Sequence, residues 1–178
     1  MINRIAAYIK KNELFPPNAT IIVGVSGGAD SVALLDVLYK LNYSCVVAHC
    51  NFHLRGDESM RDEYFVESLV EKYKLPYEKI DFDTIQWAHK KSISIEMAAR
   101  ELRYTWFAQL SEKYHTDYIA VAHHSDDNIE TVLLNLTRGT GILGLTGIAP
   151  KNGRVVRPFL DISRKDILTY LSENGLSH

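Results

Sequence analysis

Cysteine is scarce in this sequence. The two cysteines, Cys45 and Cys50, fall on one expected strand and form no Cys-x-x-Cys pair. Strand residues rise by about 3.3 Å each and alternate in direction, so these thiols would lie roughly 16 Å apart on opposite faces. A disulfide needs Cα atoms within about 7 Å. The pair is therefore not expected to bond, and the common cysteine-based zinc and redox motifs are excluded.

Long apolar runs are also lacking. No run approaches the roughly 20 residues that a membrane-spanning helix needs. The segment from Met1 to Tyr8 lacks the apolar core and the cleavage site of a secretory signal. The sequence predicts no membrane association and a cytoplasmic location. With 178 residues, 46% of them hydrophobic and 24% charged, the chain suits one soluble globular domain, 1–178, with a full core.

A strong positive charge is absent overall, since the formal net charge is −2. Positive charge is nevertheless concentrated between positions 138 and 165, where Asp161 is the one acid. The basic residues there are Arg138, Lys151, Arg154, Arg157, Arg164 and Lys165. Such a stretch can form an edge that contacts nucleic acid. It can equally be a solvated rim, and charge alone slightly favours the rim.

Apolar periodicity predicts strands that alternate with helices. Strands are expected over 20–25, 44–50, 77–82, 117–122 and 154–156. Helices are expected over 2–12, 31–41, 60–74, 84–90 and 125–137, from Ser94 to about Tyr114, and from Ser163 to about Asn174, with both serines as N-caps. This alternation predicts a doubly wound α/β fold, a five-stranded parallel sheet with helices on both faces and the order 3-2-1-4-5. Ligands bind such sheets at the carboxyl ends of the strands where the winding reverses, here between strands one and four.

The first expected strand runs directly into Ser26-Gly27-Gly28-Ala29-Asp30-Ser31. Glycines let the backbone approach a ligand closely, and a helix start presents free N–H groups to phosphate. Asp30 would repel phosphate unless a cation lay between them, which indicates Mg²⁺. The segment lacks the lysine of the common P-loop and is not the Rossmann glycine fingerprint. A simple strand–helix turn is the alternative for a bare glycine pair, but the complete pattern is more specific.

A second polar segment follows the fourth expected strand. It reads His123-His124-Ser125-Asp126-Asp127-Asn128-Ile129-Glu130-Thr131. A single acid in the first turn of a helix can simply complement the helix dipole. Three acids and two histidines, opposite a glycine turn, instead favour a cation site for Mg²⁺ or a ligand ammonium group.

Three further segments keep two interpretations each. After the second strand, Asn51 could contact a nucleobase edge and Arg55 a phosphate, whereas no spacing among His49, His53 and His123 supports zinc. Arg100 either pairs with Glu96 at the helix surface or contacts phosphate. The glycine-rich segment 139–147 is either a flexible connection or an ordered lid.

Together these segments resemble the PP-loop, or N-type, ATP pyrophosphatases, and within them the bacterial tRNA(Ile)-lysidine synthetase family. The matching segments span about residues 20–161. They are Ser26 to Ser31, His49 to Arg55, Glu96 to Arg100, His123 to Thr131, Leu136 to Gly147, and Arg157-Pro158-Phe159-Leu160. The first motif is shared across the superfamily, and the last four narrow it to this family. Asn128, where Gln is frequent, and Phe52-His53, where His commonly follows Asn directly, depart from the family pattern.

The resemblance implies a two-step reaction. ATP adenylates the C2 carbonyl oxygen of the wobble cytidine in the CAU anticodon of tRNA(Ile), and pyrophosphate is released. The ε-amine of free L-lysine then attacks C2 and AMP leaves, giving lysidine. The implied cofactors are ATP and Mg²⁺, the partners are this tRNA and lysine, and a homodimer is allowed. The chain is expected to be an N-terminal catalytic domain that ends before a tRNA-binding C-terminal region.

The resemblance also assigns residues. ATP binding falls to Ser26, Gly27, Gly28, Ala29, Asp30, Ser31, His49, Asn51, Arg100 and His123. The catalytic residues are Asp30, Arg100, Asp127 and Glu130; of these, Asp127 and Glu130 would bind lysine, and Asp30 and Asp127 would bind the metal. Arg55, Arg138 and Arg157 would contact tRNA. One alternative is another PP-loop tRNA-modifying enzyme, but an iron–sulfur thiolase would need Cys-x-x-Cys pairs, which this sequence lacks. The other is a non-catalytic nucleotide-binding module, which leaves the acids at 126, 127 and 130 unexplained.

Overall fold

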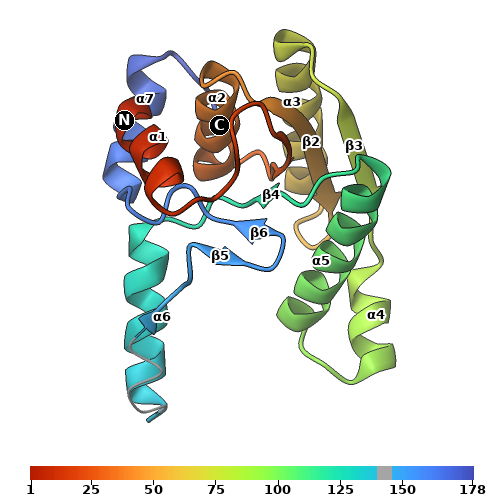
Figure 1. Ribbon diagram of the computed structural model, residues 1–178. Helices are drawn as coiled ribbons and strands as arrows, with labels where there is room; N and C mark the ends of the chain where they lie inside the picture. The colour runs from red at the N-terminus through yellow and green to blue at the C-terminus, as the bar shows by residue number, and fades with distance from the viewer. Residues whose placement is uncertain (140–145) are drawn as a thin grey trace.

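The computed structural model describes residues 1–139 and 146–178 (Figure 1). Its sheet has six strands in the order β3-β2-β1-β4-β6-β5. The strands are β1 (Thr20–Gly24), β2 (Ser44–Asn51), β3 (Tyr77–Asp81), β4 (Ile119–Ala120), β5 (Lys151–Asn152) and β6 (Val155–Val156). All neighbours pair in parallel except β5 and β6, which are antiparallel. The predicted order 3-2-1-4-5 is confirmed, with β6 as the fifth predicted strand.

The described residues also contain seven helices. They are α1 (Ile2–Lys11), α2 (Ala29–Lys40), α3 (Asp57–Tyr73), α4 (Thr84–Lys91), α5 (Ile95–Lys113), α6 (Ser125–Thr137) and α7 (Arg164–Glu173). The two predicted serine caps are confirmed: the Ser94 hydroxyl accepts the Met97 N–H at 3.1 Å, and the Ser163 hydroxyl accepts the Asp166 N–H at 3.1 Å. None of these helices is both long and apolar enough to cross a bilayer.

The structure corrects the predicted strand count. The sheet is not purely parallel, because β5 and β6 form a hairpin around Gly153, whose φ is +57°. The two residues of β5, Lys151 and Asn152, are exposed and show no alternation of apolar and polar side chains. The sequence therefore does not predict this strand. Helix α2 also begins earlier than expected, at Ala29, because Gly28 is its extended N-cap. Part of the predicted 139–147 loop, residues 140–145, lies outside the described residues.

Two apolar layers hold β1 at the centre of the sheet. Ile21 and Val23 pack toward the core formed with α2, while Ile22 packs on the other face against Phe107 and Leu110 of α5. All five are at most 3% exposed, and burying each large apolar side chain stabilises the fold by about 1.5–3 kcal/mol. The carboxyl end of β1, and the loop that follows it, therefore start from a rigid support.

Helix α6 differs from the others because none of its described residues is buried. Figure 1 shows it standing out from the body of the domain, with its first turn near the sheet and its last turn far away. Only the start of α6 is thus placed beside the carboxyl ends of the central strands.

Candidate active site

The loop after β1 is shaped by its own residues. Gly27 has a φ of +94°, and a Cβ at this position would lie 3.2 Å from the Asp62 Cβ, so glycine suits both the backbone and the close packing on α3. The Ser26 N–H donates to the Ser31 hydroxyl at 3.1 Å, and that hydroxyl donates to the Gly28 carbonyl at 2.9 Å. The loop therefore has a defined shape at the N-terminus of α2.

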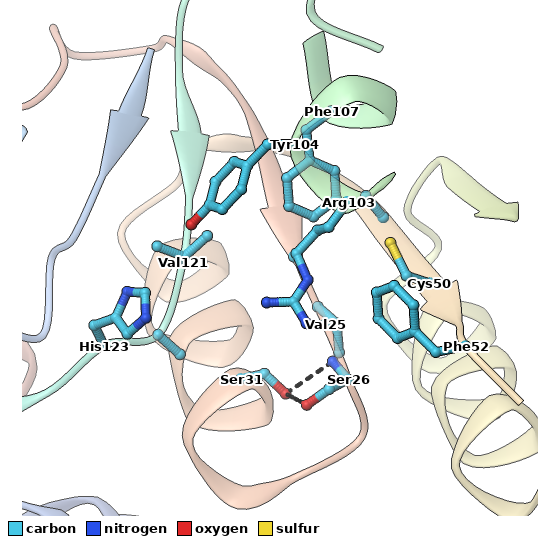
Figure 2. Close-up of a pocket in the computed structure, with 13 residues that line it drawn as sticks. Val25, Ser26, Ser31, Cys50, Phe52, Arg103, Tyr104, Phe107, Val121 and His123 are labelled. Atoms are coloured by element: carbon cyan, nitrogen blue, oxygen red, sulfur yellow. Dashed lines mark hydrogen bonds between the residues drawn. The ribbon is translucent and has the colours of Figure 1, made fainter. Parts of the chain in front are cut away.

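A pocket of about 210 Å³ lies above this loop, between β1, β2, β4 and α5 (Figure 2). Its position agrees with the site expected where the winding reverses. The lining residues are Gly24, Val25, Ser26, Ser31, Ala48, Cys50, Phe52, Arg103, Tyr104, Phe107, Val121, Ala122 and His123. Most of the wall is apolar, and the polar groups are the two serines, Arg103, Tyr104 and His123. Few polar groups on an apolar wall are typical of a small-molecule site.

Three lining residues of α5 were not singled out by sequence: Arg103, Tyr104 and Phe107. Figure 2 shows the Arg103 guanidinium reaching into the pocket toward Ser26 and Ser31. It also lies 5.2 Å from the centre of the Phe52 ring. The predicted Arg100 is exposed, and its guanidinium stacks over the Tyr104 ring at 5.0 Å. Arg103 lies three residues after Arg100, so the two side chains share one face of α5. This spacing could have indicated Arg103 from the sequence.

His123 lines the pocket and is contacted by Arg157, which is not one of the lining residues. The Arg157 Nε donates to the His123 Nδ1 at 3.3 Å, and its Nη1 donates to the Ala149 carbonyl at 2.7 Å. Burial, followed by the nearby Arg157 charge, lowers the pKa of His123. The ring is therefore neutral at pH 7, with Nδ1 as an acceptor. Arg157, predicted to contact tRNA, is buried here, and its guanidinium contacts His123 rather than the outer surface.

We expect Arg157→Gln to raise the pKa of His123, because it removes a neighbouring positive charge. The check is a pH titration of the imidazole signals by NMR, with Arg154→Gln as control, since Arg154 pairs with Glu112 and Asp117 at the surface. An unchanged or lower pKa would contradict this account. In the unaltered protein the neutral ring contributes stability above its unfolded-state pKa of about 6.5, and that contribution is lost as the pH falls below it.

The first turn of α6 brings two predicted carboxylates toward one histidine. His124 is the N-cap of α6: its N–H donates to Asp127 Oδ2 at 2.8 Å, and its Nδ1 accepts the Asp127 N–H at 3.5 Å. On the other side, its Nε2 lies 3.7 Å from Asp30 Oδ2. Asp30 of the glycine loop and Asp127 of α6 therefore flank the same imidazole ring, at the same edge of the sheet.

Asp30 has one paired oxygen and one unpaired oxygen. Oδ2 accepts from Arg164 Nη1 at 2.7 Å, whereas Oδ1 is buried and has no hydrogen-bond partner among the described residues. Carboxylate oxygens are the protein ligands that Mg²⁺ prefers, often one or two of them together with substrate phosphates. No group of three or more His, Cys, Asp or Glu within 1–139 and 146–178 is placed to hold a metal alone. Asp30 and Asp127, which both flank His124, are the carboxylates at this edge that could help to hold such an ion together with a nucleotide.

The remaining predicted residues do not all gather at this edge. Glu130 lies one turn beyond Asp127 and is exposed. Arg138 is the C-cap of α6, which places it about 20 Å along the helix from its start, given 1.5 Å per residue. Arg55 is exposed and pairs with Asp62 at 2.8 Å. The three predicted tRNA contacts therefore lie in three separate parts of the structure: Arg55, Arg138 and Arg157.

His49 and Asn51, predicted to bind ATP, are buried in the body of the protein and do not line the pocket. The His49 Nδ1–H donates to the Val25 carbonyl at 2.8 Å. The Asn51 side chain donates to Glu63 at 2.8 Å and accepts the His53 N–H at 3.0 Å. These residues support the glycine loop and the turn after β2 through those contacts, while the His49 Nε2 is buried and has no hydrogen-bond partner among the described residues.

His49→Ala should destabilise the fold by about 1–3 kcal/mol, because it leaves the buried Val25 carbonyl without a donor. His49→Asn should recover most of that loss, because the asparagine amide can donate from nearly the same position as Nδ1. Urea denaturation measures both variants. His53→Ala is the control: His53 pairs with Asp81 at the surface, and its loss should cost less than about 1 kcal/mol. Equal losses for the two His49 variants would contradict this role.

The fold and the site define a nucleotide-binding α/β domain with a glycine loop at the switch between β1 and β4. The family model of the PP-loop domain matches residues 1–178, and the chain belongs to the PP-loop domain family. Over its full 178 residues the chain is 55% identical to the tRNA(Ile)-lysidine synthase of Parabacteroides distasonis, of which it covers 41%. It is 40% identical over 178 residues to the tRNA(Ile)-lysidine synthase of Bacillus subtilis, a match that covers 96% of this chain and 38% of that protein.

The chain thus spans about two fifths of the length of these curated relatives. Among solved structures, an NMN synthetase from Francisella tularensis superposes with a TM-score of 0.68 at 12% identity, covering 98% of this chain and 69% of that chain. An NH3-dependent NAD synthetase from Campylobacter jejuni gives a TM-score of 0.63 at 14% identity, covering 98% and 71%. At such low identity these two structures establish the shared fold alone.

Proposed function

We propose that this chain is the ATP-binding, catalytic part of a ligase that joins lysine to the wobble cytidine of tRNA(Ile) with a CAU anticodon. ATP would activate C2 of that cytidine as an adenylate with loss of pyrophosphate. The ε-amine of L-lysine would then displace AMP and leave lysidine. The observation that carries this proposal is the 55% identity, over the whole chain, to a tRNA(Ile)-lysidine synthase. Residues 1–178 would form the N-terminal catalytic domain of a longer protein.

The geometry supports one arrangement of ATP. The pocket, at about 210 Å³, is smaller than the roughly 300–1,000 Å³ of sites that enclose a whole drug-sized ligand. The base and ribose would occupy it beside Tyr104 and Arg103. The phosphates would extend over Gly27 and Gly28 at the N-terminus of α2, where free N–H groups and the helix dipole favour anions. Asp30 and Asp127 would hold Mg²⁺, whose charge offsets that of the departing pyrophosphate.

Lysine would bind at the start of α6 through its ammonium groups. Asp127 and Glu130 are three residues apart and so lie on one face of the helix. Asp127 already caps the helix through the His124 N–H. Glu130 is exposed, and no ion pair among the described residues involves it. We therefore assign the larger share of ammonium binding to Glu130.

The alternative function is that of a sulfur-transferring PP-loop enzyme, and the state of the cysteine in the pocket disfavours it. Cys50 lines the pocket, but burial raises its pKa to about 12. The group is therefore a thiol at neutral pH, and the thiolate is the form that acts as a nucleophile. A lysine-using ligase needs no protein thiolate.

The test is pyrophosphate release by the longest natural protein that contains residues 1–178, incubated with ATP, Mg²⁺, L-lysine and tRNA(Ile) with a CAU anticodon. Repeated turnover that requires both the tRNA and lysine is expected. A tRNA with uridine at the wobble position and ornithine in place of lysine are the matched controls. ATP binding without tRNA-dependent turnover would favour a non-catalytic nucleotide-binding module instead.

A further inference from the structure

Helices α2 and α7 lie side by side, parallel and in register. Three hydrogen bonds join them at a constant separation of 134 residues along the chain. These join Asp30 to Arg164, Asp36 to Tyr170, and Lys40 to Asn174. The middle contact is buried, since Asp36 is 2% exposed and Tyr170 is 5% exposed. This packing fixes the start of α7, and with it Arg164, beside the glycine loop.

Arg164 is an unusual residue for its position. It is the first residue of α7, followed by Lys165, and a cation at a helix N-terminus is opposed by the helix dipole. Two acids offset that disadvantage: Asp30 accepts from Nη1, and Asp126 accepts the Arg164 N–H at 3.0 Å. The Arg164 side chain is 51% exposed. The Asp30 partner is 25% exposed, and an ion pair with one half-exposed member contributes only modestly to stability, so stability alone is a weak reason for an arginine here.

We propose that Arg164 is a phosphate-contacting residue of the nucleotide site and exchanges one partner for another. In the free protein its guanidinium neutralises Asp30. When a polyphosphate binds over the glycine loop, the guanidinium turns from Asp30 to the phosphate oxygens. This inference rests on the proposed function in that it assigns ATP to the same loop.

Three observations support the exchange. Arg164 is half exposed and held to Asp30 by a single 2.7 Å contact, so the side chain can turn without disturbing the core. Arginine presents a planar fork of donors that matches phosphate. The exchange also releases Asp30, whose second oxygen is buried without a partner in the described part of the chain, and so leaves this carboxylate available to Mg²⁺.

The test measures binding of inorganic pyrophosphate by isothermal titration calorimetry, without divalent cations, at one salt concentration. We expect Arg164→Gln to weaken binding roughly tenfold or more, the size of one lost charge-assisted contact. Lys165→Gln is the matched control, because it removes the same charge from the adjacent exposed position, and it should weaken binding less than about twofold by screening. Asp30→Asn should tighten binding, because it removes a repulsive carboxylate and frees Arg164.

The double variant Asp30→Asn with Arg164→Gln separates the two effects. If Arg164 receives the phosphate, the gain from Asp30→Asn shrinks when Arg164 is absent. An undiminished gain, equal losses for Arg164→Gln and Lys165→Gln, or no binding by the unaltered protein would each overturn the inference. Thermal unfolding checks that the variants are folded, and Arg164→Lys replaces Arg164→Gln if the latter is not. Since the probe needs neither tRNA nor lysine, a failed ligase assay leaves this result interpretable.

Discussion

Asp30→Ala is expected to abolish pyrophosphate release, with a loss of at least roughly 100-fold, the scale of removing one preorganised charge-stabilising group. The reason is geometric: Asp30 lies in the glycine loop where we propose that the phosphates bind, beside His124 and with one buried oxygen unpaired in the described part of the chain. The fold should remain intact, because an acid in the first turn of a helix stabilises it by only about 0.3–1 kcal/mol. Pyrophosphate release and circular dichroism measure the two expectations.

Asp161→Ala is the matched control for that experiment. Asp161 is also a carboxylate paired with an arginine, Arg4 at 3.0 Å, but its side chain is exposed and its partner belongs to α1. Its loss should leave pyrophosphate release unchanged. Retained release by Asp30→Ala, in a protein with an unaltered circular dichroism spectrum, would remove Asp30 from the metal-binding role.

Glu130→Ala should raise the KM for lysine by roughly 10- to 100-fold while the KM for ATP changes little. A hydrogen bond between charged groups contributes about 1.5–3 kcal/mol, which corresponds to that range in affinity. Glu130 suits this test because it has no part in the capping box that joins His124 and Asp127. Steady-state kinetics with lysine and ATP varied separately measures both constants.

Glu130→Gln distinguishes charge from shape. If the carboxylate binds an ammonium group, Gln should behave nearly as Ala does, because both lack the charge. Asp127→Ala is a less direct comparison, since it also removes the capping bond to the His124 N–H. An unchanged KM for lysine, or an equal rise in the KM for ATP, would refute the assignment of Glu130.

The sequence predicts those local features whose interaction partners are close together in the chain. The glycine turn after β1 and the serine caps at Ser94 and Ser163 depend on neighbours within a few positions, and the structure contains all of them. The strand order followed from right-handed crossovers between successive parallel strands, with β1 and β4 as neighbours. These features need no knowledge of distant residues.

The residues at the carboxyl end of β2 show the limit of what local patterns predict. The family resemblance assigns His49 and Asn51 to ATP, and that assignment stays a prediction; among the residues of β2, Ala48 and Cys50 line the pocket. Side chains alternate between the two faces of a strand, so a difference of one position reverses which residues face the ligand. Nothing in the polar character of His49 or Asn51 says which face α5 covers, because that depends on how α5 packs on the sheet.

By itself, the sequence determined the alternation of strands and helices, the glycine turn, the acidic first turn of α6 and the family to which the chain belongs. Only the tertiary structure decided which face of β2 meets the pocket, that Arg103 enters it, and that Arg157 is buried against His123. It alone also paired Asp30 with Arg164, 134 residues away. The physical reason is range: periodicity and capping act over two to four residues, whereas a site is assembled from strand ends and helix starts that meet only after packing.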